Sequence, residues 1–236
     1  MNPPPEHNQV PAWRHCRFVW LVAAGVAVVF VWSAIAPRER LTWWLEIFPV
    51  LIAVPLLVAT ARRFPLTDLA YLLIGIHACI LLVGGHYTYA QVPAFNWLRD
   101  HLHLARNDYD RVGHFAQGFV PAVLAREILL RRSPLRRGKW LFATVVAFCL
   151  AISALYELFE WLTALVAGSS AEAFLGTQGD PWDTQEDMAT ALVGAVVSLV
   201  LLSRVHDRQL RRLLQSYDHR PPDEPWLSIP SAPADE

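Results

Sequence analysis

The sequence has few charged residues, and its basic and acidic residues are nearly equal in number. Asp, Glu, Lys and Arg make up only 17% of its 236 residues, against about 25% in soluble globular proteins. The 20 basic and 21 acidic residues give a net charge of −1, which argues against a basic nucleic-acid-binding protein. Of the three cysteines, Cys79 and Cys149 lie in apolar segments, so we expect no disulfide framework.

Familiar catalytic motifs are missing as well. The sequence has no G-x-S-x-G, no P-loop and no G-x-G-x-x-G, so serine hydrolases and nucleotide- or dinucleotide-binding enzymes lack support. It also lacks H-E-x-x-H and C-x-x-C, and where di-iron helix bundles carry Glu-x-x-His it has Glu-x-x-Glu.

Long apolar runs dominate what is present. Hydrophobic residues make up 54% of the chain, and runs of about 20 apolar residues are long enough to cross a hydrocarbon core of about 30 Å. We predict an all-α, polytopic membrane helix bundle with six transmembrane helices. The predicted spans are residues 18–36, 43–61, 69–85, 112–130, 140–167 and 188–205. In the fourth span, the charged side chains of Arg126 and Glu127 lie near one end, where we expect them to snorkel to the interface.

The basic residues predict the orientation of this bundle. Thirteen Lys and Arg residues flank the spans on the side of the N-terminus and five on the other side, which places both termini in the cytoplasm. The first run is longer than a signal-peptide core, and Pro37 follows it directly, so we expect a retained helix. We divide the chain into an N-terminal tail (1–17), a transmembrane domain (18–205) and a disordered C-terminal tail (206–236).

Ionisable residues collect at the outer side of this predicted bundle. Asp110 and His114 lie one helical turn apart, as do Glu157 and Glu160, and as do Asp183 and Asp187. His86 and Tyr87 end the third span on the same side. Because ionisable groups in a bilayer are costly, they normally face the bundle interior or a water-filled cavity.

Imidazole and carboxylate ligands suit zinc, manganese or iron, so this cluster is a candidate divalent-metal site. We predict metal ligands from one set of residues: His86, Asp110, His114, Glu160 and Asp187. Glu157 or Asp183 would act as the general base. Two alternatives stay open: Asp110 orients His114 instead of binding metal, or Glu157 pairs with Arg111 in a structural ion network.

The segment before the sixth span also has a distinctive composition. Residues 175–183 read Leu-Gly-Thr-Gln-Gly-Asp-Pro-Trp-Asp, with two glycines for a tight backbone and a turn at Asp180. We predict either a lid over the polar cluster, with Gln178, Asp180 and Trp182 at its rim, or a loop that caps the sixth helix.

Taken together, these motifs carry a resemblance. The runs at 86–89 (HYTY), 107–115 (NDYDRVGHF), 156–161 (YELFEW) and 175–183, followed by Asp187 and Met188, resemble the YjdF family of bacterial inner-membrane proteins. The resemblance implies a multi-pass protein of the bacterial inner membrane and brings no established activity with it. More distantly, residues 110–115, the two glutamates and Asp183-x-x-x-Asp187 are similar to the VanZ-like pattern, which includes proteins linked to glycopeptide resistance.

Three classes of function follow from these observations. The first is a metal-dependent hydrolase or transferase acting on an envelope or lipid-linked substrate at the periplasmic face, where the metal lowers the pKa of a bound water towards about 7. The second is a non-catalytic envelope or assembly protein whose cluster orders the bundle. The third, a transporter, ranks lower because residues 140–156 of the fifth span carry no charge across the inner half.

Overall fold

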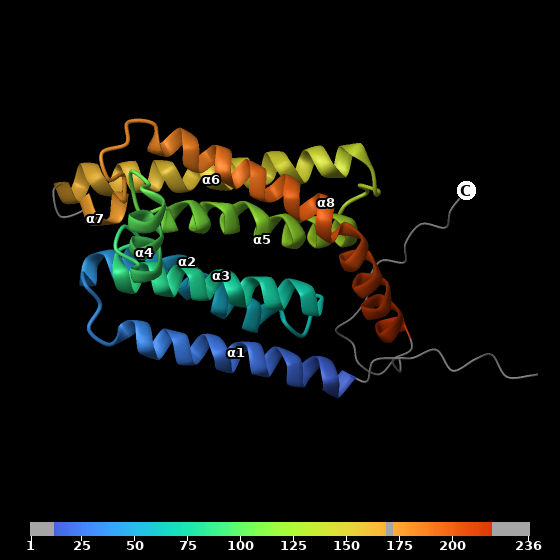
Figure 1. The fold of residues 1–236 in the computed structure, drawn as a ribbon. Coiled ribbons are helices and arrows are strands. Elements are labelled where there is room, and N and C mark those ends of the chain that lie inside the picture. The colour runs from blue at the N-terminus through green and yellow to red at the C-terminus, as the bar shows by residue number, and fades with distance from the viewer. Residues whose placement is uncertain (1–11, 169–171, 219–236) are drawn as a thin grey trace, which may run out of the picture.

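The computed structural model describes residues 12–168 and 172–218, and over these residues the chain is entirely helical. The proline-rich ends of the chain fall outside the described residues. Eight helices and no strand are described (Figure 1). The helices are α1 (Ala12–Ala34), α2 (Arg40–Thr60), α3 (Asp68–Tyr87), α4 (Pro93–Leu102), α5 (Tyr109–Arg132), α6 (Lys139–Ala167), α7 (Glu172–Leu175) and α8 (Asp183–Asp218). The all-α prediction is therefore confirmed.

Five of the described helices are long and apolar enough to cross a membrane, namely α1, α2, α3, α6 and α8. They match five of the six predicted spans. The remaining span, 112–130, corresponds to α5, a continuous helix of 24 residues that is less apolar than these five. Its buried residues explain this, because they include charged and imidazole side chains as well as alanine and valine. Helix α8 continues to Asp218, so residues 206–218 are helical where the sequence predicted a disordered tail.

Helix α5 lies at the centre of the bundle. In Figure 1 it runs between α3 on one side and α6 and α8 on the other, and it packs against all three. One apolar core joins α5 to α6 and α8 through Ala122, Val145, Cys149 and Ala195. A second joins α5 to α3 through residues such as Val120 and Tyr71. A helix enclosed in this way can carry polar side chains because its neighbours, not lipid, surround them.

Two glycines let α5 and α8 approach each other very closely. A Cβ at Gly118 would lie 1.7 Å from the carbonyl oxygen of Ala191, and one at Gly194 would lie 2.2 Å from that of Phe115. Only a residue without a side chain fits at either position, as is common where membrane helices cross. The crossing brings the first turns of α5 and α8 together at one end of the bundle.

The other end of this helix pair holds a fully buried polar network, which we call the inner network. Glu127 accepts hydrogen bonds from the backbone and hydroxyl of Thr67, from Arg131 and from the ring of His206. Arg126 lies 2.8 Å from the other ring nitrogen of His206. The expectation that Arg126 and Glu127 snorkel to the interface is therefore wrong: both side chains are buried, because α8 brings His206 and Asp207 to meet them.

Candidate metal centre

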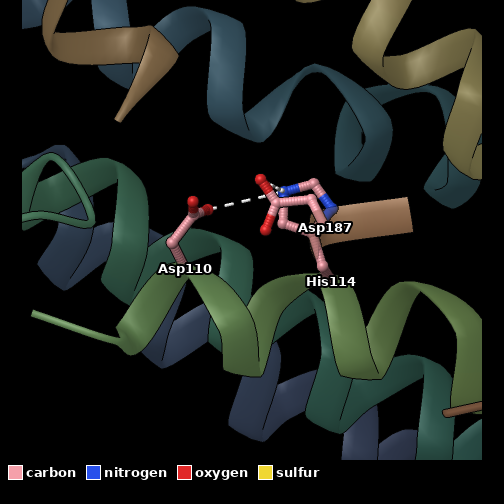
Figure 2. Close-up of side chains that lie close together, drawn as sticks. All are labelled: Asp110, His114 and Asp187. Atoms are coloured by element: carbon pink, nitrogen blue, oxygen red, sulfur yellow. Dashed lines mark ion pairs between the residues drawn. The ribbon is translucent and has the colours of Figure 1, made fainter. Parts of the chain in front are cut away.

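The first turns of α5 and α8 place two carboxylates and one imidazole in contact. Asp110 and His114 lie one turn apart on α5, and Asp187 faces them from α8 (Figure 2). His114 Nε2 is 3.5 Å from Asp110 Oδ1 and 3.7 Å from Asp187 Oδ2. One ligand atom from each residue lies within 4.8 Å of the others, and all three residues are buried. Two ligand atoms on a tetrahedral ion with bonds of about 2.1 Å are roughly 3.4 Å apart, so the spacing suits a small divalent cation.

The ring of His114 is oriented by its own helix. Its Nδ1 lies 2.9 Å from Oε1 of Gln117, three residues along α5. An amide oxygen can only accept, so Nδ1 carries a proton and donates it. The other ring nitrogen, Nε2, faces the two carboxylates, so it is the atom that would bind a metal. Metal-binding histidines are typically held by this kind of second hydrogen bond.

Glu157 of α6 completes the inner side of this cluster. Its Oε1 lies 3.7 Å from Nδ1 of His114. The side chain is 94% buried, since its exposed fraction is 6%, and Oε1 has no hydrogen-bond partner among the described residues. A buried carboxylate oxygen without a partner costs free energy, so it marks a place where a ligand, water or proton belongs.

Two arginines balance the acidic residues around the cluster. Arg106 contacts Asp183 closely and lies 3.3 Å from Asp110 and 3.5 Å from Asp180. Burial lowers the pKa of Arg106, but the hydrogen bond and charge of Asp183 outweigh that effect and raise it overall. Arg106 therefore stays charged.

Arg111 pairs with the opposite side of the same group. It contacts Asp187 closely and lies 2.6 Å from Glu186 and 3.3 Å from Asp180. Asp183 is thus held between two guanidinium groups, whereas Glu157 makes no ion pair with an arginine among the residues that the structure describes. Of the two residues predicted as a general base, Glu157 is the freer to accept a proton.

The segment before α8 is fastened to the start of α5. Gln178 forms a reciprocal pair with the backbone of Asn107, accepting at 3.0 Å and donating at 2.9 Å. Gly176, Gln178 and Gly179 all have positive φ, so the two glycines supply the backbone that this tight turn needs. Arg106 also donates to the carbonyl oxygens of Gly176 and Thr177. The turn therefore lies over the cluster, and Trp182 beside it has an exposed ring.

Several functional candidates lay outside the sequence-based set. Glu46 of α2 is buried and accepts a hydrogen bond at 3.4 Å from Tyr156, whose ring packs edge-on against His114. Burial and the charge of Glu46 raise the pKa of Tyr89 well above its ordinary value, so Tyr89 is neutral. Gln117 and Arg106 are the other additions. The sequence held two signals for these residues: Gln117 is a polar residue inside a predicted span, and Glu46 is an acid inside an apolar run.

Two predicted ligands are not among the three residues whose ligand atoms converge. His86 packs against Trp32 of α1, and its Nδ1 is 3.0 Å from the carbonyl oxygen of Ser33. Tyr87 beside it also contacts Trp32. Glu160 lies on the half-buried face of α6 and is not among the residues whose ligand atoms converge. The structure thus brings Asp110, His114 and Asp187 together, with Glu157 and Asp183 beside them, and leaves the other two predicted ligands outside.

A helical bundle with five apolar helices long enough to span a bilayer defines a multi-pass membrane protein. Residues 18–208 match the family described as "Predicted membrane protein (DUF2238)", and the chain belongs to this family. It is 52% identical over 190 residues to the inner membrane protein YjdF of Escherichia coli (strain K12). The aligned residues cover 80% of this chain and 91% of that protein. No solved structure matches the chain.

These comparisons confirm the resemblance to YjdF and the location in the bacterial inner membrane. The more distant similarity to the VanZ-like pattern stays a prediction.

Proposed function

We propose that the protein is a divalent-metal-dependent hydrolase or transferase that acts on an envelope or lipid-linked substrate. The metal ligands are Asp110, His114 and Asp187, and Glu157 is the general base. The observation that carries this proposal is the convergence of three buried ligand atoms within 4.8 Å beside a buried carboxylate oxygen that has no partner among the described residues.

The chemistry of these side chains supports the assignment. A divalent cation bound to one imidazole and two carboxylates has positions left for water and substrate, and it lowers the pKa of bound water towards about 7. Glu157 lies beside the same ring, on its Nδ1 side at 3.7 Å, and its unpartnered carboxylate oxygen would be the proton acceptor for such a water. Arg106 and Arg111 hold Asp183, Asp180 and Asp187 in position. The turn with Gln178, Asp180 and Trp182 serves as the rim through which substrate enters.

This proposal includes a six-span topology. Helix α5 is the sixth crossing: 24 residues at 1.5 Å each reach about 36 Å, enough to cross the hydrocarbon core. Both termini lie in the cytoplasm, with residues 18–205 as the transmembrane domain, and the metal centre opens on the periplasmic side. The predominance of basic residues on the opposite side of the bundle supports this orientation.

Metal analysis of purified variants tests the proposal. Wild-type protein should retain one zinc, manganese or iron ion per chain after dialysis, and His114→Ala should retain none. Glu157→Gln should keep the ion but lose hydrolysis of a chromogenic phosphodiester or carboxylic ester. The matched control is Asp100→Asn, which removes an exposed carboxylate from α4 and should leave both properties unchanged. Wild-type protein without stoichiometric metal would refute the proposal.

One observation favours a second candidate, a non-catalytic protein whose polar cluster orders the bundle. Arg106 and Arg111 pair directly with the carboxylates, so the negative charge of the cluster is partly neutralised without a metal ion. On this alternative, Glu157→Gln and His114→Ala should both lower the melting temperature in detergent and leave metal content at background.

A further inference from the structure

A groove lies on the membrane-facing side of the bundle between α1 and α3, and it includes none of the proposed metal ligands. It has a volume of about 380 Å³. Its walls are formed by two short stretches, residues 21–26 of α1 and residues 72–83 of α3, and Tyr109 of α5 also lines it. We call this the α1–α3 groove. We propose that it binds one hydrocarbon chain of a bilayer lipid, a site independent of the proposed metal chemistry.

The lining excludes polar ligands. Apart from Cys79 and Tyr109, every lining residue is aliphatic or glycine. The hydroxyl of Tyr109 is already engaged, because it donates to the carbonyl oxygen of Ile80 at 3.0 Å. Only the thiol of Cys79 is left, and a thiol is a weak donor. A ligand there is held by apolar contact alone.

The position of the groove identifies the surrounding medium. Both walls belong to helices that are long and apolar enough to cross a membrane. Residues 72–83 lie in the middle of α3, four residues from either end of the helix. At that depth the bilayer consists of lipid chains, and headgroups and water are absent. The groove is therefore continuous with the lipid-facing surface of α1 and α3, where Leu21 and Ile76 are exposed.

The dimensions fit one chain and not a helix. Residues 72–83 extend over about 16 Å at 1.5 Å per residue. Dividing the volume of about 380 Å³ by this length gives a cross-section of about 24 Å². A helix with its side chains, about 10 Å across, would need roughly 80 Å². A second copy of this chain could cover the groove but could not fill it.

Packing above and below keeps the groove open. Val26, Val29 and Phe30 of α1 pack against the cluster of Trp43, Ile47 and Leu82, and Val19 packs at the other end. Between these contacts, Gly25 has no atom within 4 Å of the position that a Cβ would take. A larger side chain at Gly25 therefore occupies the groove without displacing a helix. The neighbouring Gly75 differs, because a Cβ there would lie 2.5 Å from Val22.

Photocrosslinking in nanodiscs tests this site. The probe is a phosphatidylethanolamine with a diazirine in one acyl chain, added to discs of phosphatidylethanolamine and phosphatidylglycerol. Wild-type protein should crosslink mainly within residues 21–26 and 72–83, and Gly25→Leu should abolish that crosslink. Ala23→Leu is the matched control, because it adds the same side chain at an exposed position on α1 that does not line the groove. Its crosslinks should equal those of the wild type.

Helical content and melting temperature show whether Gly25→Leu folds. If it does not, Cys79→Phe, which fills the groove from α3, takes its place and should abolish the same crosslink. Native mass spectrometry of the wild type after detergent washing should also show one retained lipid. Crosslinks spread evenly over α2 and α6 and insensitive to both variants would overturn the proposal, as would a wild type that retains no lipid. A dimer without bound lipid in native mass spectrometry would assign the surface to a second copy instead. None of these outcomes depends on metal content, so the groove and the metal centre succeed or fail separately.

Discussion

Replacing Gly118 by alanine should damage the proposed metal centre without touching any of its residues. The new Cβ would lie 1.7 Å from the carbonyl oxygen of Ala191, where contacts below 3.0 Å essentially do not occur. Because that oxygen belongs to the backbone, no side-chain rotation relieves the overlap. Helices α5 and α8 must separate by at least about 1.3 Å, the difference between those two distances.

The separation reaches the site because Asp187 lies one turn before Ala191 on α8. A shift of that size lengthens the distance between His114 Nε2 and Asp187 Oδ2 from 3.7 Å to about 5 Å, too far for both atoms to bind one ion. Overpacking of this kind also costs about 1–3 kcal/mol of stability. For a chain of this length, each kcal/mol lowers the melting temperature by about 2–4 °C.

The assay compares melting temperature and bound metal for Gly118→Ala and Gly25→Ala. The second variant makes the same substitution where nothing lies within 4 Å, and it should keep wild-type metal content and at least wild-type stability, because alanine favours the helix. Gly194→Ala should resemble Gly118→Ala, since it obstructs the same crossing from the other helix. If Gly118→Ala melts and binds metal like the wild type, our account of the crossing is wrong.

Three further predictions test separate parts of the structure. Gln117→Leu removes the hydrogen bond that orients His114 and should weaken metal affinity about 10- to 100-fold at unchanged helical content, measured by competition with a metal indicator dye. Glu127→Ala removes the buried carboxylate that accepts from Thr67, Arg131 and His206 and should cost about 3–5 kcal/mol in chemical unfolding, while metal content per folded chain stays at the wild-type level. Removing the metal with a chelator should lower the melting temperature of the wild type, because an ion at 100 times its Kd contributes about 2.7 kcal/mol; His114→Ala should not respond, and an equal response would show that the chelator acts elsewhere.

The sequence predicted the helices well because apolar length is a local property. Five predicted spans match helices that can cross a membrane, and the sixth matches α5. Helix α8 is longer than its predicted span, because it runs from Asp183 to Asp218. The pairs Asp110 with His114 and Asp183 with Asp187 were also visible, because residues one turn apart share a helix face wherever the helix lies.

Contacts between helices could not be predicted in the same way. His86 stands at the correct end of α3, but its side chain points to Trp32 and Ser33 of α1, and nothing local specifies that direction. Glu46 is an isolated acid in an apolar run until Tyr156 of α6 is placed beside it. Arg126 and Glu127 looked like residues at a helix end. Their burial became apparent only with His206, about 80 positions away in the sequence.

The inner network and the glycine crossing hold α5 and α8 together at two points along their length. Two rods fixed at two points cannot rotate against each other without breaking one attachment, so the ligand-bearing ends form a rigid frame. If the proposed function is correct, exchange of substrate and product at the cluster falls to the turn around Gln178, whose attachment to Asn107 is two hydrogen bonds. The backbone amides of this turn should exchange with deuterium much faster than those of α5 beneath it, and the opening rate of the turn then limits how fast any molecule enters or leaves.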